Sequence, residues 1–122
     1  MAHKHVPQCP VEWALSAIGG RWKIVILCQL FEGNSRFNEL RRALPGISQR
    51  VLAQQLRELE RDSIVRRAQA ASPPRVEYAL TEFGRTLEPV LEALCEWGEA
   101  LQERFTARTV TSPAAATPGV RE

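Results

Sequence analysis

The segment between Ser48 and Leu80 constrains the fold more than any other part of the chain. A helix is predicted to start at Ser48, its N-cap, and to end near Asp62. Leucines mark one face of this helix, at Leu52, Leu56 and Leu59. At about 100° per residue, the long polar side chains fall within roughly 60° of one another on the opposite face. These side chains are Arg50, Gln54, Arg57 and Arg61. One face is therefore expected in the core, and the other favours an anionic partner.

Two short strands are predicted after this helix, over residues 64–68 and 76–80. In the second strand, Val76, Tyr78 and Leu80 alternate with Glu77 and Ala79, the period of a half-buried strand. The loop between the strands, residues 69–75, contains a Pro-Pro pair. Strands this short do not build a sheet of their own, so we expect a hairpin attached to the helix. This order of elements is the outline of a winged helix-turn-helix, a DNA-binding module.

The remaining elements are predicted to be helices, which gives a mainly α fold with a small antiparallel β wing. A first helix starts at Cys9-Pro10 and ends at Gly19-Gly20, and a second begins near Arg21 and is apolar nearly all round, as in a central core helix. A short helix over residues 36–43 stops before Pro45-Gly46. Thr81 is expected to cap a final helix, with a kink or restart at Pro89.

The predicted organisation is a flexible tail over residues 1–8, one domain over 9–105 and a disordered tail over 106–122, where the sequence is low in complexity. The longest apolar run, residues 24–28, is far shorter than the roughly 20 residues that span a bilayer. The N-terminus has no apolar segment typical of a secretion signal. We therefore expect a cytoplasmic protein without a membrane partner.

Positive charge is concentrated in the region of the predicted motif. Residues 21–75 carry eleven basic and five acidic side chains, whereas the rest carries five basic and nine acidic ones, and the whole chain has a net charge of +2. Such a separation suits contact with phosphates through one region only. Solvation of helix surfaces is the alternative explanation of these charges.

Several motifs, taken in order, resemble one family. They are CPVEWALSAIGGRWKIVIL, RFNELRRALPGISQRVLAQQLRELERD, PPRVEYALTEFG and LEPVLEALCEWG. Over about residues 9–105 the chain is similar to the HxlR-type winged helix-turn-helix transcriptional regulators of bacteria. The resemblance implies a homodimer, held by the first and last helices, that binds an inverted-repeat operator in double-stranded DNA and acts as a repressor or activator, most simply a repressor.

The resemblance also assigns roles to residues. Residues 48–61, beginning with Ser48, match the recognition helix, residues 66–75 match the wing, and Arg36 and Asn38 match positions that face the DNA backbone. Because Arg pairs with guanine and Gln with adenine in the major groove, and readout concentrates near the helix N-terminus, we predict three base readers. They are Gln49, Arg50 and Gln54. The predicted phosphate contacts are Arg57, Arg36, Lys23 and Arg75.

Two departures from the family pattern matter. Ser63 stands where the family usually has a glycine in the left-handed conformation, which should cost on the order of 1 kcal/mol. The wing tip, residues 69–72, carries no charge, which argues against its insertion into a minor groove.

The last helix is more apolar than a small monomer can hide, so a second subunit is expected to cover it. Intramolecular packing on the first two helices is the alternative. The predicted dimer contacts are Val11, Leu15, Leu91, Leu94, Trp97, Leu101 and Phe105.

The chain has three cysteines, and the odd number argues against a disulfide framework. Cys9 matches the cysteine by which some family members sense oxidants or quinones, and a helix N-terminus favours its thiolate. It is either such a sensor, with an oxidant or small-molecule effector, or only a helix cap. Cys28 is expected to pack in the core, and Cys95 is expected either to pack or to resolve a disulfide. His3, His5 and Cys9 offer three possible metal ligands without preorganisation, so neither a metal nor another cofactor is predicted.

Two functions of other classes stay open. A winged helix that binds a protein instead of DNA would favour a neutral or acidic recognition face, whereas this face is basic. A thiol-dependent enzyme would favour a Cys-x-x-Cys motif or a histidine paired with a nucleophile in the folded region, and both histidines precede Cys9. We therefore do not expect an enzyme.

Overall fold

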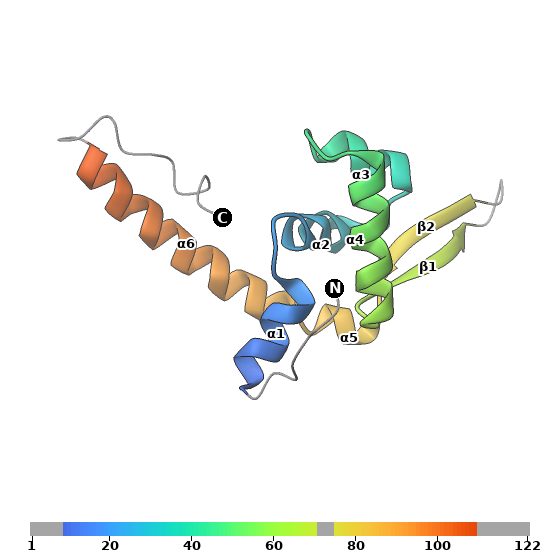
Figure 1. The fold of residues 1–122 in the computed structure, drawn as a ribbon, viewed down its shortest axis with the longest axis horizontal. Helices are drawn as coiled ribbons and strands as arrows, with labels where there is room; N and C mark the ends of the chain where they lie inside the picture. The colour runs from blue at the N-terminus through green and yellow to red at the C-terminus, as the bar shows by residue number, and fades with distance from the viewer. Residues whose placement is uncertain (1–8, 71–74, 110–122) are drawn as a thin grey trace. The chain divides into compact units, whose positions relative to one another are not determined.

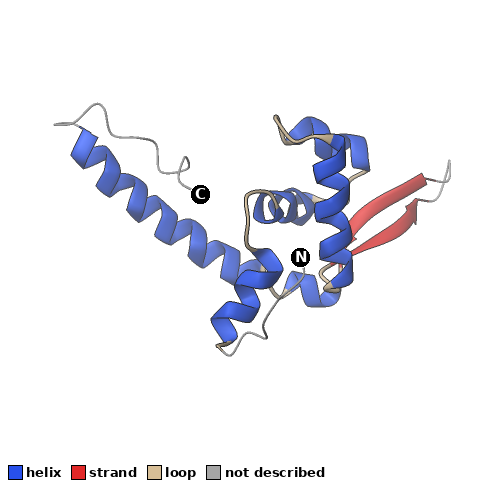
Figure 2. Cartoon of the chain, viewed as in Figure 1, coloured by secondary structure: helices blue, strands red, loops and turns tan. Residues whose placement is uncertain are grey.

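The computed structural model describes residues 9–70 and 75–109, and the chain forms two compact units, Met1–Thr86 and Leu87–Glu122. The first unit has five helices and one antiparallel hairpin among its described residues, in the order shown in Figure 1. They are α1 (Pro10–Ile18), α2 (Lys23–Glu32), α3 (Phe37–Ala43), α4 (Gln49–Arg61), β1 (Val65–Ala70), β2 (Arg75–Leu80) and α5 (Glu82–Arg85). Figure 2 shows that helix dominates and that strand is confined to the hairpin, so the predicted fold class is confirmed.

The core of the first unit lies around α2, which contacts α3, α4 and β2. Its buried side chains come from nearly every element of the unit, and the most enclosed are large aliphatic residues: Ile26, Leu27, Leu40, Leu52, Leu56, Leu59 and Val65. The leucine face predicted for α4 is therefore confirmed. Burial of such side chains contributes about 1.5–3 kcal/mol each, so α2 and α4 are the main source of cohesion.

The end of α4 forms a Schellman motif around Ser63. The amide of Ile64 donates to the carbonyl of Leu59 at 3.0 Å, and the amide of Ser63 donates to that of Glu60 at 2.9 Å. Ser63 has a φ of 61°, in the left-handed region. The sequence prediction of a left-handed residue here is confirmed, although the residue is not a glycine.

Strand β2 forms backbone hydrogen bonds along both of its edges. Strand β1 pairs with β2 from Val65 opposite Leu80 to Ala70 opposite Arg75. On the other edge, Ser35 and Tyr78 exchange two backbone hydrogen bonds, of 3.1 and 2.7 Å. The segment that leads into α3 thus acts as a minimal third strand.

The predicted alternation in β2 is wrong. Val76 is exposed, Tyr78 is half-buried, and both Ala79 and Leu80 are buried. Burial follows distance along the hairpin instead of the strand period, because only the proximal end of β2 lies against the helices.

Thr81 caps α5, a short separate helix, and not the long final helix. Its hydroxyl accepts a hydrogen bond from the amide of Gly84 at 2.8 Å and donates one to the carbonyl of Ser63 at 2.6 Å. A Cβ atom at Gly84 would overlap the carbonyl oxygen of Ile64. A glycine is therefore needed where α5 approaches the start of the hairpin.

The second unit contains one described helix, α6 (Glu88–Thr109). It begins after a break at residues 86–87, with Pro89 in its first turn, so the predicted restart is confirmed. The helix continues past residue 105, where the sequence predicts a tail, and residues 110–122 lie outside the described part. No single described helix is long and apolar enough to cross a membrane; α1 and α2 would be so only when taken together, and they are bent by 75° at the break between them.

Candidate nucleic-acid interface

Helices α3 and α4 and the turn between them form a helix-turn-helix. The turn is anchored by the buried side chains of Leu44 and Ile47, and it reverses the chain at Gly46, where φ is 95°. Ser48 then caps α4 as predicted, because its hydroxyl oxygen accepts a hydrogen bond from the amide of Val51 at 3.1 Å. The first residues of α4, Gln49 and Arg50, are exposed to solvent.

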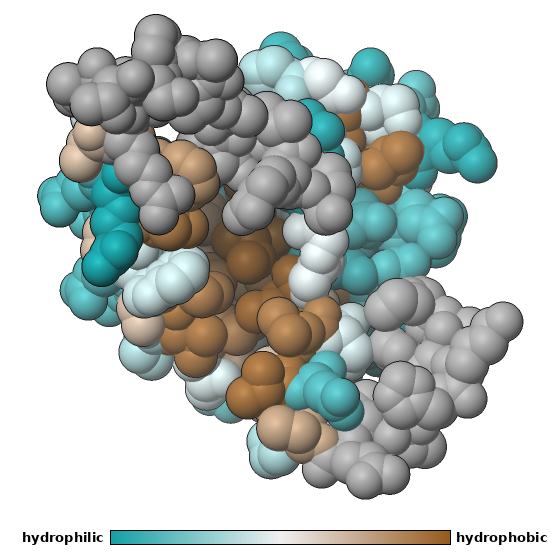
Figure 3. Space-filling view, turned by 60° about the vertical axis from the view of Figure 1, so that its left-hand side comes forward, coloured by the Kyte–Doolittle hydropathy of each residue, from teal (hydrophilic) through white to brown (hydrophobic). Residues whose placement is uncertain are grey.

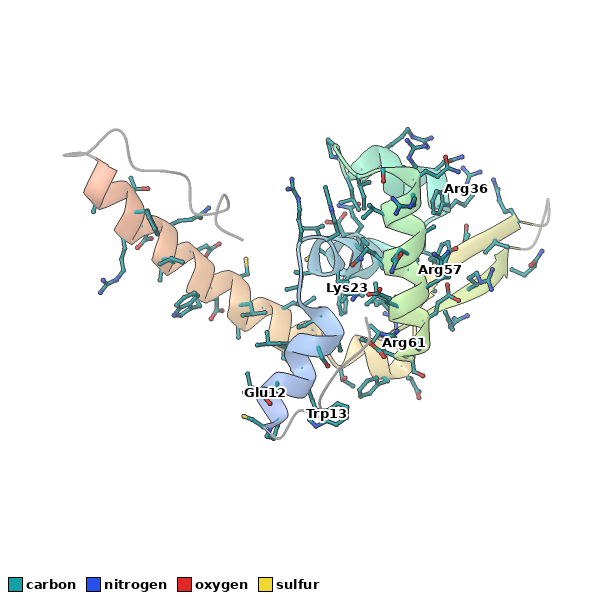
Figure 4. All side chains as sticks on the ribbon, viewed as in Figure 1. Glu12, Trp13, Lys23, Arg36, Arg57 and Arg61 are labelled. Atoms are coloured by element: carbon teal, nitrogen blue, oxygen red, sulfur yellow. The ribbon has the colours of Figure 1, made fainter. Side chains whose placement is uncertain are left out.

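The outer face of α4 is basic and exposed. All the polar residues predicted on that face are exposed, and so are the two residues at its start: Ser48, Gln49, Arg50, Gln54, Arg57 and Arg61. Figure 4 shows Arg57 and Arg61 on this helix. Arg61 forms a 3.5 Å ion pair with Asp62, whereas Arg50 and Arg57 form no ion pair with any other described residue. These two guanidinium groups are the ones best placed for an anionic ligand.

Lys23 is not on this surface, and its predicted role as a phosphate contact is wrong. Its side chain is 5% exposed, and its ammonium is paired with the carboxylate of Glu58 at 2.5 Å. In Figure 4 it lies between α2 and α4. A cation that must compensate a buried carboxylate cannot also reach a phosphate without leaving that carboxylate unpaired.

Glu58 receives a second hydrogen bond from the recognition face. The amide nitrogen of Gln54 donates to Oε2 of Glu58 at 3.0 Å, while Lys23 occupies Oε1. These hydrogen bonds, that of Gln54 first, lower the pKa of Glu58 to about 2 against the opposing effect of burial. Gln54 is therefore an exposed side chain with a fixed partner. Sequence reasoning missed this network, although a lysine at the start of an apolar helix signals a need for a carboxylate.

The start of α3 presents further polar groups. The amide of Arg36 donates to Oε1 of Glu39 at 2.7 Å, and its guanidinium donates to Oε2 at 3.2 Å. The hydrogen bond from the Arg36 amide, and then that from its side chain, lower the pKa of the Glu39 carboxyl. Arg36 is thus half-exposed and already paired, while Asn38 is exposed.

Two arginines that the sequence analysis did not select lie beside Asn38. Arg41 and Arg42 are exposed on α3, and with Asn38, Gly46 and Ile47 they line an open hollow of about 420 Å³. A basic hollow beside a recognition helix suits a phosphate group. The signal in the sequence was the Arg-Arg pair, which was counted only as charge.

The wing contributes exposed arginines on both strands. Arg75 is exposed at the distal end of the hairpin, opposite Ala70, and Arg66 is exposed on β1. Arg67 is paired with Glu60 of α4 at 3.3 Å, which links β1 to that helix. Burial, and then the charge of Glu60, raises the pKa of Tyr78 on β2. Within the uncharged wing tip, residues 69–70 end β1, and residues 71–72 lie outside the described part of the chain.

The three cysteines are all exposed, so the prediction that Cys28 packs in the core is wrong. Cys28 lies on the solvent side of α2, a helix that is less completely buried than its composition suggests. Cys9 is the N-cap of α1, as predicted, but its sulfur makes no capping hydrogen bond within the described residues. Its backbone carbonyl accepts from the amide of Glu12 at 2.8 Å.

Each unit also exposes apolar side chains, and Figure 3 shows one face on which hydrophobic residues, in brown, reach the surface. On α1, Val11 is 62% and Leu15 58% exposed, and Trp13, which was not among the predicted contacts, is 55% exposed. On α6, Leu94 and Trp97 are 45% and 66% exposed. The other predicted contacts of that helix are partly exposed: Leu91, Leu101 and Phe105.

Among the described residues, no group of three or more His, Cys, Asp or Glu side chains could hold a metal ion. His3 and His5, from the ligand set considered in the sequence, lie outside that part of the chain.

Comparison with known proteins gives consistent matches. A model of the HxlR-like helix-turn-helix family matches residues 17–106. The HTH-type transcriptional regulator YdeP of Bacillus subtilis is 54% identical over 98 residues, which are 80% of this chain and 77% of YdeP. Among solved structures, the reduced form of the redox regulator HypR matches with a TM-score of 0.74 and 50% identity, over 81% of this chain and 99% of that one. The reduced form of the transcriptional regulator YodB from B. subtilis matches with a TM-score of 0.69 and 39% identity, over 76% and 93%.

Proposed function

The chain belongs to the HxlR-like helix-turn-helix family, and from this premise we propose that it is a sequence-specific, double-stranded-DNA-binding transcriptional regulator that acts as a repressor. The observation that carries the proposal is the exposed basic face of α4 opposite its buried leucines. An α-helix fits the major groove, and arginine and glutamine are the side chains that pair best with guanine and adenine there. Acting on chromosomal DNA places the protein in the cytoplasm.

The contacts divide by their position on the interface. Gln49, Arg50 and Gln54 read bases, because the N-terminal half of a recognition helix enters the groove. The predicted phosphate contacts other than Lys23 are retained: Arg36, Arg57 and Arg75, together with Asn38. Arg41 and Arg42 join them through the hollow at the start of the turn. Phosphate contacts fix the register on the duplex, and base contacts select the sequence.

The working form is a homodimer that binds an inverted repeat. Exposed apolar side chains on α1 and α6, above all Val11, Leu15 and Trp97, support an interface made by these two helices. Two recognition helices related by a two-fold axis read half-sites about one helical turn of DNA apart. A repressor that competes for a promoter needs such a bivalent site to reach useful affinity.

We also propose that Cys9 makes DNA binding responsive to oxidants or electrophiles. The thiol is exposed at the N-terminus of α1, and its sulfur is not used as a cap among the described residues. The solved relative HypR is a redox regulator. A change at Cys9 would act at the helix that we place in the dimer interface, and would thereby alter the spacing of the recognition helices.

The first test is the affinity of Arg50→Ala for a duplex that the wild-type protein selects from a random library. Loss of the bidentate contact with a base should weaken specific binding by about 1–3 kcal/mol, while binding to unrelated DNA changes little. Fluorescence anisotropy at two salt concentrations measures both affinities, because phosphate contacts weaken steeply with salt. Arg85→Ala, an exposed arginine on α5, is the matched control and should bind as the wild type does.

Wild-type affinity in Arg50→Ala would remove Arg50 from the base readers. A wild-type protein that selects no sequence at all would instead favour the protein-interaction module.

The second test concerns Cys9→Ser. Diamide or a quinone should change operator binding by the wild type at least several-fold and should leave Cys9→Ser unaffected, because serine cannot form the thiolate that reacts. Cys28→Ser is the control, since this thiol is also exposed, and it should respond as the wild type does. Undiminished sensitivity of Cys9→Ser would exclude Cys9 as the sensor.

A further inference from the structure

Gln54 is the one predicted base reader whose side chain has a hydrogen-bond partner in the structure's described part. Its amide nitrogen donates to Oε2 of Glu58, one helical turn further along α4, at 3.0 Å. Gln54 is exposed, whereas Glu58 is 9% exposed. The network therefore links a group at the DNA-facing surface to a charge inside the protein.

The other oxygen of Glu58 is held by Lys23 at the first position of α2, at 2.5 Å. Because both oxygens accept hydrogen bonds and the side chain is little exposed, the carboxylate has few other orientations. Its low pKa keeps it ionised at every pH at which the protein would bind DNA. The carboxylate is thus a fixed acceptor behind the recognition face.

A carboxylate accepts hydrogen bonds and does not donate them. The amide of Gln54 must therefore turn its nitrogen toward Glu58, and a flipped amide would set two acceptor oxygens against each other. One N–H group and the carbonyl oxygen of Gln54 remain available. An acceptor and a donor side by side are complementary to N6 and N7 of adenine.

We infer that Glu58, braced by Lys23, is a positioning residue that fixes the amide orientation of Gln54 and so sets the preference of the recognition helix for adenine at one position of each half-site. The inference rests on the proposed function, since it concerns the specificity of the same surface. Neither Glu58 nor Lys23 touches DNA in this arrangement. They fix the orientation of the Gln54 side chain before DNA binds, which lowers the conformational entropy lost when Gln54 contacts the base.

The test uses the double variant Lys23→Met/Glu58→Leu, which removes both charges together and leaves neither unpaired. Duplexes selected by the wild-type protein are substituted base pair by base pair, and dissociation constants are measured by anisotropy. Gln54→Ala identifies the position that Gln54 reads. At that position, the ratio of the dissociation constants for the substituted and the selected duplex should be about tenfold smaller in the double variant than in the wild type. Adding Gln54→Ala to the double variant should reduce this ratio no further.

Gln49→Ala supplies the matched control within the same duplex, because Gln49 is exposed at the start of α4 and is one of the other predicted base readers. The base preference that depends on Gln49 should survive in the double variant. Full retention of the Gln54-dependent preference by the double variant would overturn the inference, and so would a Gln54→Ala protein that keeps every preference. Failure of the wild type to select any duplex would instead count against the proposed function itself.

A second measurement needs no substitution and stays valid if the double variant does not fold. The side-chain NH₂ group of Gln54 in the free wild-type protein should show restricted motion in ¹⁵N relaxation, whereas that of Gln49 should be mobile. Equal mobility of the two groups would show that Glu58 does not hold the amide of Gln54, and the inference would be wrong.

Discussion

At the scale of single residues, Ser63 carries a backbone conformation that its side chain disfavours. It closes α4 with a φ of 61°, where an L-residue with a Cβ atom is strained and glycine is not. Ser63→Gly should therefore raise the free energy of unfolding by about 1 kcal/mol. Urea denaturation followed by circular dichroism measures the change.

The control for this substitution is Ala43→Gly, at the exposed end of α3. Glycine there should lower stability by up to about 1 kcal/mol, because it replaces a good helix former in a helical conformation. A loss in both variants would show that the left-handed conformation is not the source of strain at Ser63.

Glu58 gives the first unit a defined response to acid. Its pKa in the folded protein is about 2, lowered from an ordinary value of 4.5. A carboxyl group whose pKa falls on folding stabilises the protein fully above its unfolded pKa, and this stabilisation is lost as the pH falls toward the folded pKa. Between pH 4.5 and pH 2, the wild type should lose on the order of 3 kcal/mol through this group.

Urea midpoints at a series of pH values and a fixed protein concentration test this loss. Glu58→Gln should be less stable than the wild type at pH 7, because Lys23 is left buried without its ion, and should depend less on pH below 4.5. Glu39→Gln is the control, because Glu39 is more exposed. This variant should keep most of the loss of stability that the wild type shows in acid. Parallel pH curves for the wild type and Glu58→Gln would contradict the assignment.

At the scale of elements, helix periodicity was sufficient where one face of an element meets the core and the other meets water. The faces of α4 could be predicted from this periodicity. Its Ser48 cap and the restart at Pro89 followed from capping and proline preferences, and all three depend on residues within a few positions of one another. The order of helices and strands followed from the same local signals, together with the turn residues between them.

Prediction failed where burial depends on distant parts of the chain. The distal end of β2 extends beyond the helices, so Val76 is exposed despite the strand period. Cys28 lies on the uncovered side of α2, and Lys23 is buried because Glu58 is available 35 residues later. None of these outcomes is encoded within one element. The structure consequently exposes the face predicted on α4, whereas it buries the residue predicted for DNA contact at the start of α2.

At the scale of the whole molecule, the exposed apolar surface of α6 predicts self-association. Trp97 is 66% exposed, which is costly in water for a side chain of this size. Trp97→Glu should shift the protein from dimer to monomer at micromolar concentration, because it places a charge in an apolar interface. Size-exclusion chromatography with light scattering measures the mass.

Glu96→Ala is the matched control on the neighbouring position, and it should leave the mass unchanged because it removes a charge and adds none. A wild-type protein that runs as a monomer would end the dimer proposal. A dimeric Trp97→Glu protein would move the interface away from this part of α6.

The backbone bridge between Ser35 and Tyr78 ties the wing to the segment that introduces α3. The hairpin is therefore linked to the helix-turn-helix, and in the proposed complex both contact the duplex as one unit. In that complex, the protein fixes the length of duplex between the base pairs proposed for α4 and the phosphates proposed for Arg75. One inserted base pair shifts the far contact by ~3.4 Å and turns it around the helix axis, so two matching contact sites at the wrong separation do not make a half-site.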